Sequence, residues 1–430
     1  MRVAFYTLGC KVNQNDTESL MKLFEDRGYE IVPFEAGADI YIINTCSVTG
    51  TGESKSRQIV RKAVKFNPKV VVVTGCYTQV SPEEVAQLPG VNLLVGMAER
   101  PRIVDLVEEY LGQLKKQVAV GQLNHLQEWI SLPTGHSAER TRAMLKIEEG
   151  CEQFCAYCIV PYARGKVRSM PINQVIDEFK ALLSLGYKEI VLTGIHLGSY
   201  GKDIDLSLND VLKKLVMIEG DFRIRLGSIE PTDFDTHLIE TIAGNQRICQ
   251  YLHIPLQSGS DRILESMCRK YHLSDFRRLI SELRIRNPLL GVGTDLIVGF
   301  PGESDTDFDL TCQFLREISF SRIHVFRFSP RKGTPAAEMP DRISKLIQEE
   351  RSRIIQEIAG DTGHKFAEKF TGSTVEVLFE ETKDLFWTGL SGEYLKVKVK
   401  SKDLLKNTLQ KVTIQNLNGN ILIGEISSLQ

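Results

Sequence analysis

The sequence has no hydrophobic run long enough to cross a membrane. Its longest apolar stretches, "KVVVVTGC" at residues 69–76 and "EIVLTGI" at residues 189–195, are far shorter than the about 20 residues of a spanning helix. The N-terminal stretch "MRVAFYTLGCKVNQ" alternates like a strand and lacks the basic and apolar regions of a signal peptide. We therefore expect neither membrane insertion nor export.

The chain also lacks a surplus of charge of either sign. It has 53 Lys plus Arg against 55 Asp plus Glu, a net charge of −2. Any affinity for RNA must therefore come from a local basic patch rather than from the whole surface. Low-complexity tracts are absent as well. With 430 residues, the chain is long enough to fold as two to four globular domains.

Cysteine, in contrast, is plentiful for a chain without an export signal. Nine cysteines in such a chain predict thiols kept reduced in the cytoplasm, where close spacing indicates metal binding or catalysis. Three of them, Cys249, Cys268 and Cys312, have no partner at metal-binding spacing. We interpret these three as core or incidental residues.

The order of apolar segments divides the chain into an α/β front part and a linker. In residues 1–113, short apolar strands alternate with amphipathic helices, which predicts an open, doubly wound parallel sheet. Residues 114–140 lose this periodicity and gather Gly, Ser, Pro and His, as linkers do.

Two further domains follow the linker. Residues 141–370 contain a second alternating series of six strand–helix units, which indicates a partial (β/α)6 barrel. Residues 371–430 contain four short strand-like segments, "STVEVLFEE", "EYLKVKVKS", "KNTLQKVTIQN" and "NILIGEIS", with Gly and Asn turns, and these predict a small all-β barrel. The expected fold is thus an α/β protein with an all-β C-terminal domain.

Three cysteines lie close together after the first strand of the predicted central barrel. Cys151, Cys155 and Cys158 form a C-x3-C-x2-C motif without a fourth cysteine or histidine nearby. Thiolates select zinc, cuprous copper or iron–sulfur clusters. A structural zinc ion would need a distant fourth protein ligand, whereas a four-iron cube held by three cysteines leaves one iron open. Both interpretations fit the spacing.

This spacing resembles the signature of the radical S-adenosylmethionine (radical SAM) enzymes. In that family the three cysteines hold a [4Fe–4S] cluster, and S-adenosylmethionine (SAM) binds the fourth iron through its amino and carboxylate groups. The resemblance implies that Cys151, Cys155 and Cys158 are cluster ligands and that Tyr157 lies beside the adenine of SAM. The protein then has to set the cluster potential and exclude water.

Other residues of the SAM pocket are suggested by the same resemblance. The segment "LTGIHLGSYG" occupies the place of the family's glycine-rich strand end, which points to Thr193 and Gly194. Four polar residues are expected to end later strands and line the pocket: Ser228, Glu230, Gln257 and Asp295. Each could instead be an ordinary polar cap of a strand end. No catalytic residue is expected beyond the cluster ligands.

A second set of cysteines is spread over the front domain. Cys10, Cys46 and Cys76 are far apart in sequence, but each follows a predicted strand. Because the carboxyl ends of parallel strands meet at one edge of a sheet, the three thiols should converge there. Neighbouring Gly residues would let the backbone approach a bulky cluster. The alternative is three buried cysteines that act as small hydrophobic residues.

With both sets, the whole chain resembles the methylthiotransferases. These enzymes have an N-terminal domain with an auxiliary three-cysteine [4Fe–4S] cluster, a radical SAM barrel and a C-terminal RNA-binding TRAM domain. The segments "TLGCKVNQND" and "NTCSVTG" resemble most the branch that modifies N6-threonylcarbamoyladenosine in tRNA. The resemblance implies two [4Fe–4S] clusters, SAM, a tRNA substrate and an electron donor such as flavodoxin or ferredoxin.

Other functions remain open at this point. The substrate could be isopentenyladenosine in tRNA or an aspartate of a ribosomal protein, since related branches modify these groups. A different class of protein, a non-catalytic RNA-binding protein with structural zinc, would also use cysteines at short spacing.

Two basic features support contact with RNA. Five cations recur along one predicted helix after Cys46: Lys55, Arg57, Arg61, Lys62 and Lys65. Such a stripe could contact phosphates and position a tRNA loop, although a basic helix face is often only solvated. In the C-terminal domain, "YLKVKVKSK" alternates lysines on one strand face, but residues 371–430 contain as many acidic residues as lysines.

Overall fold

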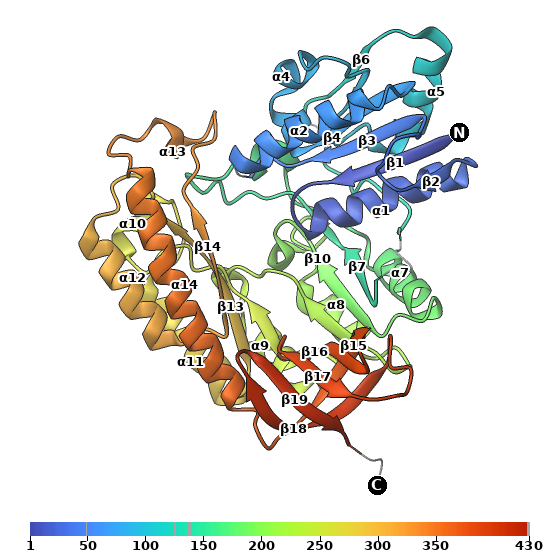
Figure 1. The fold of residues 1–430 in the computed structure, drawn as a ribbon. Coiled ribbons are helices and arrows are strands. Elements are labelled where there is room, and N and C mark those ends of the chain that lie inside the picture. Colours follow the sequence, from blue (N-terminus) through green and yellow to red (C-terminus); the bar gives the residue numbers. More distant parts are fainter. Residues whose placement is uncertain (49, 124–125, 136–139, 428–430) are drawn as a thin grey trace.

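The computed structural model describes residues 1–48, 50–123, 126–135 and 140–427. It has three parts, with the N-terminal sheet at the top of Figure 1, a curved sheet with its helices in the middle, and a small barrel at the bottom. None of its helices among the described residues combines the length and the apolar content of a membrane span. The α/β class with an all-β C-terminal barrel is confirmed.

The N-terminal part is an open sheet of parallel strands in the order β2-β1-β3-β4-β5-β6. Its strands are β1 (Arg2–Thr7), β2 (Glu30–Val32), β3 (Ile40–Thr45), β4 (Val70–Gly75), β5 (Leu93–Val95) and β6 (Gln117–Ala119). Its helices are α1 (Lys11–Asp26), α2 (Gly50–Lys65), α3 (Cys76–Val80), α4 (Pro82–Ala86), the 3-10 turn η1 (Arg100–Arg102) and α5 (Ile103–Gln113).

Helices cover both faces of this sheet. Leu20 of α1 and Val107 of α5 pack on one face, and Val60 of α2 and Val85 of α4 pack on the other. Because β3 and β4 are buried on both faces, they read as continuous apolar runs rather than alternating ones. The sheet also includes β6, which lies within the stretch 114–140 expected as a linker. Residues 124–125 and 136–139 of that stretch lie outside the described residues.

The central part contains two three-stranded parallel sheets, β11-β10-β7 and β12-β13-β14, joined by isolated bridges into one curved sheet. Its long strands are β7 (Arg142–Lys146), β10 (Glu189–Thr193), β11 (Arg223–Leu226), β12 (Tyr251–His253), β13 (Gly291–Val298) and β14 (Arg322–Arg327). Six strands in chain order confirm the partial barrel.

The connecting elements of the central part include the helices that cover its outer face. The helices are α6 (Val160–Arg164), α7 (Ile172–Ser184), α8 (Leu208–Leu215), α9 (Thr236–Gly244), α10 (Asp261–Ser266), α11 (Leu273–Arg286), α12 (Asp305–Ile318), α13 (Pro335–Glu338) and α14 (Lys345–Glu368). Shorter elements are β8 (Glu148–Glu149), β9 (Arg168–Ser169), η2 (Leu197–Ser199) and η3 (Pro231–Asp233).

Successive side chains of a strand point to opposite faces of the sheet, and in the central sheet one face is apolar and the other is polar. Leu145 of β7 and Leu192 of β10 belong to the core that packs against the covering helices, together with Phe179 of α7. The alternate positions, such as Glu189 and Arg225, lie on the opposite face, which is the interior of the barrel. The barrel interior is therefore charged.

The C-terminal part is a closed barrel of five strands in the order β15-β16-β17-β19-β18. Its strands are β15 (Thr374–Lys383), β16 (Phe386–Ser391), β17 (Lys396–Lys400), β18 (Leu409–Asn418) and β19 (Ile421–Ile426). Strand β16 was not among the strands expected from the sequence. It follows a tight turn in which Asp384 and Leu385 both adopt positive φ. Because this turn contains neither Gly nor Asn, the usual mark of a hairpin is missing.

Buried arginines attach this C-terminal barrel to the central sheet. Arg223 of β11 donates to the carbonyl of Glu376 at 3.0 Å, and Arg225 donates to the carbonyl of Ser391 at 3.0 Å. Glu189 of β10 forms ion pairs with both arginines. Their positive charge holds the pKa of Glu189 below its ordinary value, although burial alone would raise it.

Candidate active site

The cysteines of the C-x3-C-x2-C motif lie in a tight loop between β8 and α6. The loop is closed at its base, where the N–H of Cys151 donates to the carbonyl of Gly165 at 3.0 Å. Gly150 has φ of 96°, and a Cβ there would come within 1.9 Å of the carbonyl oxygen of Lys166. Only glycine fits this position. The loop therefore starts at the end of the first barrel strands, where barrel active sites lie.

Two side chains from later parts of the barrel contact these thiols. Arg269 donates from Nη1 to the sulfur of Cys155 at 3.2 Å, and Nδ1 of His196 lies 3.9 Å from the sulfur of Cys151. Burial raises the pKa of Cys151 and of Cys158 to about 12. Cluster binding must therefore release protons here, and a guanidinium beside the sulfur favours the resulting thiolate. Three thiols are the donor type of an iron–sulfur cluster, although no three such side chains among the described residues are grouped as they would be around a metal ion.

The structure brings the three front-domain cysteines to one edge of the N-terminal sheet. Cys10, Cys46 and Cys76 directly follow, or lie close after, the neighbouring strands β1, β3 and β4. A Cβ at Gly9 would lie 3.2 Å from the sulfur of Cys46, so glycine allows the first loop to approach the second. Burial raises the pKa of Cys46 to about 12, and charge on Cys76 or Cys10 would raise it further.

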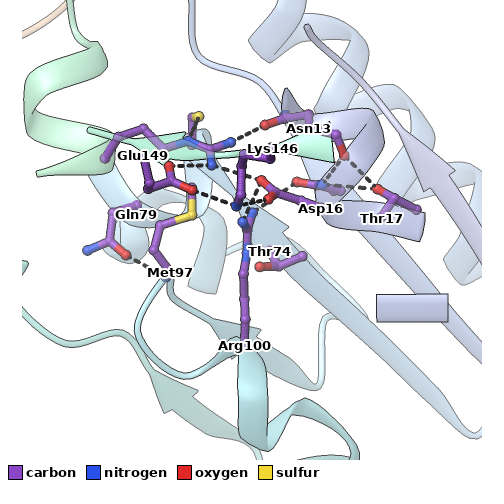
Figure 2. A network of polar contacts seen from close by, with 12 residues as sticks. Asn13, Asp16, Thr17, Thr74, Gln79, Met97, Arg100, Lys146 and Glu149 are labelled. Atoms are coloured by element: carbon purple, nitrogen blue, oxygen red, sulfur yellow. Dashed lines mark hydrogen bonds and ion pairs between the residues drawn. The ribbon is translucent and has the colours of Figure 1, made fainter. Parts of the chain in front are cut away.

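Between the two sets of cysteines lies a buried network of charges, shown in Figure 2. At its centre, the fully buried Asp16 of α1 accepts from Arg100 Nη1 at 2.6 Å and from Arg164 Nη1 at 2.8 Å. Lys146 of β7 also donates to Asp16, and to Glu149 at 2.7 Å. Burial alone would raise the pKa of Asp16, but these cations hold it well below its ordinary value.

Arg164 connects this network to the sulfur of Cys76. It is fully buried on α6, six residues after the last cysteine of the loop. Its Nε donates to Cys76 Sγ at 3.3 Å, its Nη1 also donates to Glu149 at 2.8 Å, and its Nη2 donates to Asn13. One side chain thus links the loop of one cysteine set to a member of the other.

The network has a surplus of positive charge beside the sulfur of Cys76. Three cations, Arg100, Lys146 and Arg164, face two carboxylates, Asp16 and Glu149, which leaves a charge of 3 − 2 = +1. A surplus positive charge is costly in a buried site unless an anion compensates for it. A cluster-bound thiolate is such an anion, so this set of donors also fits an iron–sulfur site.

Some of the expected SAM-pocket residues lie beside the cysteine loop. Arg269, which contacts Cys155, also pairs with Glu230. Burial raises the pKa of the Tyr157 hydroxyl, and the positive charge of Arg269 opposes this effect. Thr193 ends β10, and Gly194 follows it. A Cβ at Gly194 would lie 2.5 Å from Oε2 of Glu148 on β8, so a larger residue here would require the Glu148 side chain to move.

The other expected pocket residues lie elsewhere on the central sheet. Asp295 was expected at a strand end, but it lies in the middle of β13, because this strand continues through three further residues to Val298. Its carboxylate pairs with Nε2 of His253 at 3.2 Å. Gln257 follows β12 and donates its N–H to the carbonyl of Asp295 at 2.9 Å. Ser228 follows β11, is exposed, and bridges to His253.

Sequence reasoning missed the side chains that surround the thiols. Arg164, Arg269 and His196 contact sulfur atoms, yet each lies in a segment without a metal-binding pattern. For Lys146 and Glu149 a signal existed, because the strand segment "MLKIEEG" places charges where a buried strand should be apolar. Buried charges in a strand indicate either a functional site or a structural ion-pair network, such as that of Glu189 with Arg225.

The predicted basic helix is α2, and four of its five cations face solvent. Lys55, Arg61, Lys62 and Lys65 are exposed, and no salt bridge among the described residues involves them. Arg57 instead turns toward the domain, where it donates to the hydroxyl of Tyr77 at 3.1 Å and to Glu84 at 3.3 Å. The exposed four keep their charge available for an anionic partner.

Comparisons with known proteins agree with this arrangement. Residues 2–96 match the model described as uncharacterized protein family UPF0004, and residues 145–315 match that of the radical SAM superfamily. The threonylcarbamoyladenosine tRNA methylthiotransferase MtaB of Bacillus subtilis (strain 168) is 40% identical over 96% of this chain and 93% of its own. A tRNA-2-methylthio-N(6)-dimethylallyladenosine synthase of Moorella thermoacetica is 36% identical over 87% of this chain and 86% of its own.

A solved structure shows the same fold at low sequence identity. The radical S-adenosylmethionine methyltransferase TsrM from Kitasatospora setae, with cobalamin and a [4Fe-4S] cluster bound, superposes with a TM-score of 0.60. The alignment covers 90% of this chain and 80% of that one, with 14% sequence identity. This likeness concerns the fold alone.

Proposed function

The chain belongs to the radical SAM methylthiotransferases, and we propose that it transfers a methylthio group to carbon 2 of N6-threonylcarbamoyladenosine at position 37 of tRNAs. The product is 2-methylthio-N6-threonylcarbamoyladenosine. The observation that supports the proposal is Arg164, which lies six residues after Cys158 and donates a hydrogen bond to the sulfur of Cys76, because a methylthiotransferase needs a radical source next to a sulfur carrier.

The radical SAM family implies SAM and one [4Fe–4S] cluster as cofactors. The ligands of that cluster are Cys151, Cys155 and Cys158, and SAM lies beside Tyr157, Thr193, Gly194 and Glu230. The second cluster belongs to Cys10, Cys46 and Cys76, whose donor set supports it. When bound, SAM and the first cluster would supply a 5′-deoxyadenosyl radical, and the second cluster would carry the sulfur that is transferred.

The chain's own residues hold the thiols, neutralise charge and exclude water. Arg269 and Arg164 each donate a hydrogen bond to one proposed ligand sulfur and so bring a positive charge next to it. Both guanidinium groups are buried, with side chains no more than 3% exposed, so water does not compete for these bonds. We assign no acid or base residue beyond the cluster ligands.

Exposed basic residues on α2 and β17 support contacts with RNA. The exposed cations of α2 would contact phosphates of the anticodon arm, and the C-terminal barrel would act as a TRAM domain, with the lysines of β17 adding contacts. An electron donor such as flavodoxin or ferredoxin would reduce the cluster, and a reaction that needs reduced thiols supports the cytoplasm as its proposed location.

A direct test offers the enzyme two competing tRNAs. Reconstituted enzyme is given equal amounts of threonylcarbamoylated and isopentenylated tRNA, and the product nucleosides are resolved by mass. We expect the threonylcarbamoyl form to be preferred by a factor of about 100 to 10,000, since a site built for a polar group rejects an apolar substituent. Equal rates, or a preference for the isopentenyl form, would contradict the proposed substrate. Modification of a ribosomal protein and not of tRNA would contradict it as well.

A further inference from the structure

A cavity of about 480 Å³ lies where the three parts of the chain meet. Helix α1 contributes Lys11 and Gln14, strand β7 contributes Arg142 and Met144, and the C-terminal barrel contributes Tyr394. Lys11 directly follows Cys10 in the sequence, so the cavity adjoins the start of the helix that follows the first front-domain cysteine. The proposed reaction assigns no role to this cavity.

Tyr394 forms a rigid wall of this cavity. It lies in the turn between β16 and β17 with φ of 69°, and its ring stacks on Tyr251 with the centroids 4.8 Å apart. Two guanidinium groups lie over the ring, that of Arg225 at 4.7 Å and that of Arg322 at 5.1 Å. Burial would raise the pKa of its hydroxyl, but Lys11 and Arg142 outweigh this effect and lower the pKa. The hydroxyl thus lies close to several cations.

Most charges around the cavity are compensated within the protein. Arg142 pairs with Glu380 at 2.9 Å, and Arg225 pairs with Glu189 at 2.6 Å. Another lining residue, Arg140, pairs with Glu18 at 2.9 Å. The remaining lining carboxylate, Glu381, is exposed on β15.

Two cations of this region have no such partner. Lys11 lines the cavity, whereas Arg322 does not line it but lies over the ring of Tyr394. Neither takes part in an ion pair among the described residues, and both are exposed. Both lie near the same side chain, because Lys11 lines the cavity with Tyr394 and the guanidinium of Arg322 lies 5.1 Å from the centre of the Tyr394 ring. The cavity therefore offers positive charge to a ligand that the chain itself does not supply.

We propose that Lys11, with Arg322 and the hydroxyl of Tyr394, binds the carboxylate of the threonylcarbamoyl group. This inference rests on the proposed function and names the residues that select its substrate. In adenine, carbon 2 and carbon 6 flank the same ring nitrogen. A substituent on N6 therefore lies near the carbon that receives sulfur at Cys10, Cys46 and Cys76, within reach of the lysine that follows Cys10.

The test compares two synthetic anticodon stem–loops that differ in one charge. One carries threonylcarbamoyladenosine with a free carboxylate, and the other carries its neutral methyl ester. For the wild-type holoenzyme we expect kcat/KM for the acid to exceed that for the ester by roughly 10- to 100-fold, since a hydrogen bond to a charged group is lost. Lys11→Met and Arg322→Met should each reduce this ratio toward one, mainly through a higher KM for the acid.

Three controls separate this role from a structural one. Lys11→Arg keeps the charge and should keep most of the ratio, and Lys213→Met, on the outer helix α8, should leave the ratio unchanged. Because Lys11 adjoins Cys10, iron content is measured for each variant. Arg322 adjoins no cysteine of either set, so its variant remains informative if Lys11→Met loses iron.

The outcomes distinguish the two levels of the proposal. If the wild-type enzyme modifies neither stem–loop, the proposed function itself is wrong. If it modifies the acid but Lys11→Met and Arg322→Met keep the wild-type acid-to-ester ratio, the function stands and the carboxylate site is refuted. If the wild type does not discriminate acid from ester, the carboxylate is not recognised and the site is refuted too.

Discussion

The Cys46→Ala enzyme is expected to cleave SAM and yet to form no methylthiolated tRNA. Cys46 belongs to the sheet-edge set, whereas the loop of Cys151, Cys155 and Cys158 stays intact. With a strong reductant, this variant should release methionine and 5′-deoxyadenosine, while the 2-methylthio nucleoside falls below about one thousandth of the wild-type level, since the sulfur carrier is lost and no other group replaces it.

Two further cysteine variants serve as controls for this result. Cys155→Ala should abolish both SAM cleavage and transfer, because it removes a ligand of the radical site. Cys312→Ala, on the buried face of α12 and outside both sets, should keep both activities. Full transfer activity in Cys46→Ala would show that the sheet-edge cysteines are not a cluster site.

Arg164→Ala should destabilise the protein more than any surface substitution. Removing this guanidinium leaves the buried Asp16 and Glu149 with fewer counterions, and breaking a buried ion pair in this way costs about 3–5 kcal/mol. It also removes the hydrogen bond to Cys76. We therefore expect a clear loss of unfolding free energy in denaturant titrations of the apoprotein, together with loss of iron from the sheet-edge site.

The exposed pair of Arg277 with Glu317 provides the comparison for this variant. Both side chains are more than 40% exposed, so Arg277→Ala should cost less than about 1 kcal/mol. Arg164→Lys should recover part of the stability, because it keeps the charge, but it cannot maintain all four donor contacts of the guanidinium. An Arg164→Ala protein as stable as the Arg277→Ala protein, with full iron content, would contradict the role given to the network.

Much of the architecture could be predicted because the signals are local. The alternation of strands and helices predicts the parallel sheets. The C-x3-C-x2-C motif can be recognised by its spacing, and it follows a predicted strand. The convergence of Cys10, Cys46 and Cys76 could also be predicted, since each follows a parallel strand and such strands share one edge. The positions of the six cysteines relative to the strands could thus be predicted from the sequence, whereas their role as cluster ligands stays a prediction.

What could not be predicted depends on contacts between distant segments. Asn13 and Asp16 meet Arg164 only because α1 packs against the end of the central barrel, about 150 residues away in sequence, and no local periodicity encodes such a contact. Asp295 was misplaced because the end of a strand depends on its pairing partners, here on β14. Strand β16 was missed because its turn residues are unusual for a hairpin.

The most direct test of the central claim is the metal content of the anaerobically reconstituted protein. If the six cysteines form two separate four-iron sites, the wild type should contain about eight irons and eight sulfides per chain. The variant with Cys151, Cys155 and Cys158 replaced by alanine should keep about four of each. The variant with Cys10, Cys46 and Cys76 replaced should also keep about four of each. Zinc in place of iron, or loss of all metal from either folded variant, would contradict the account.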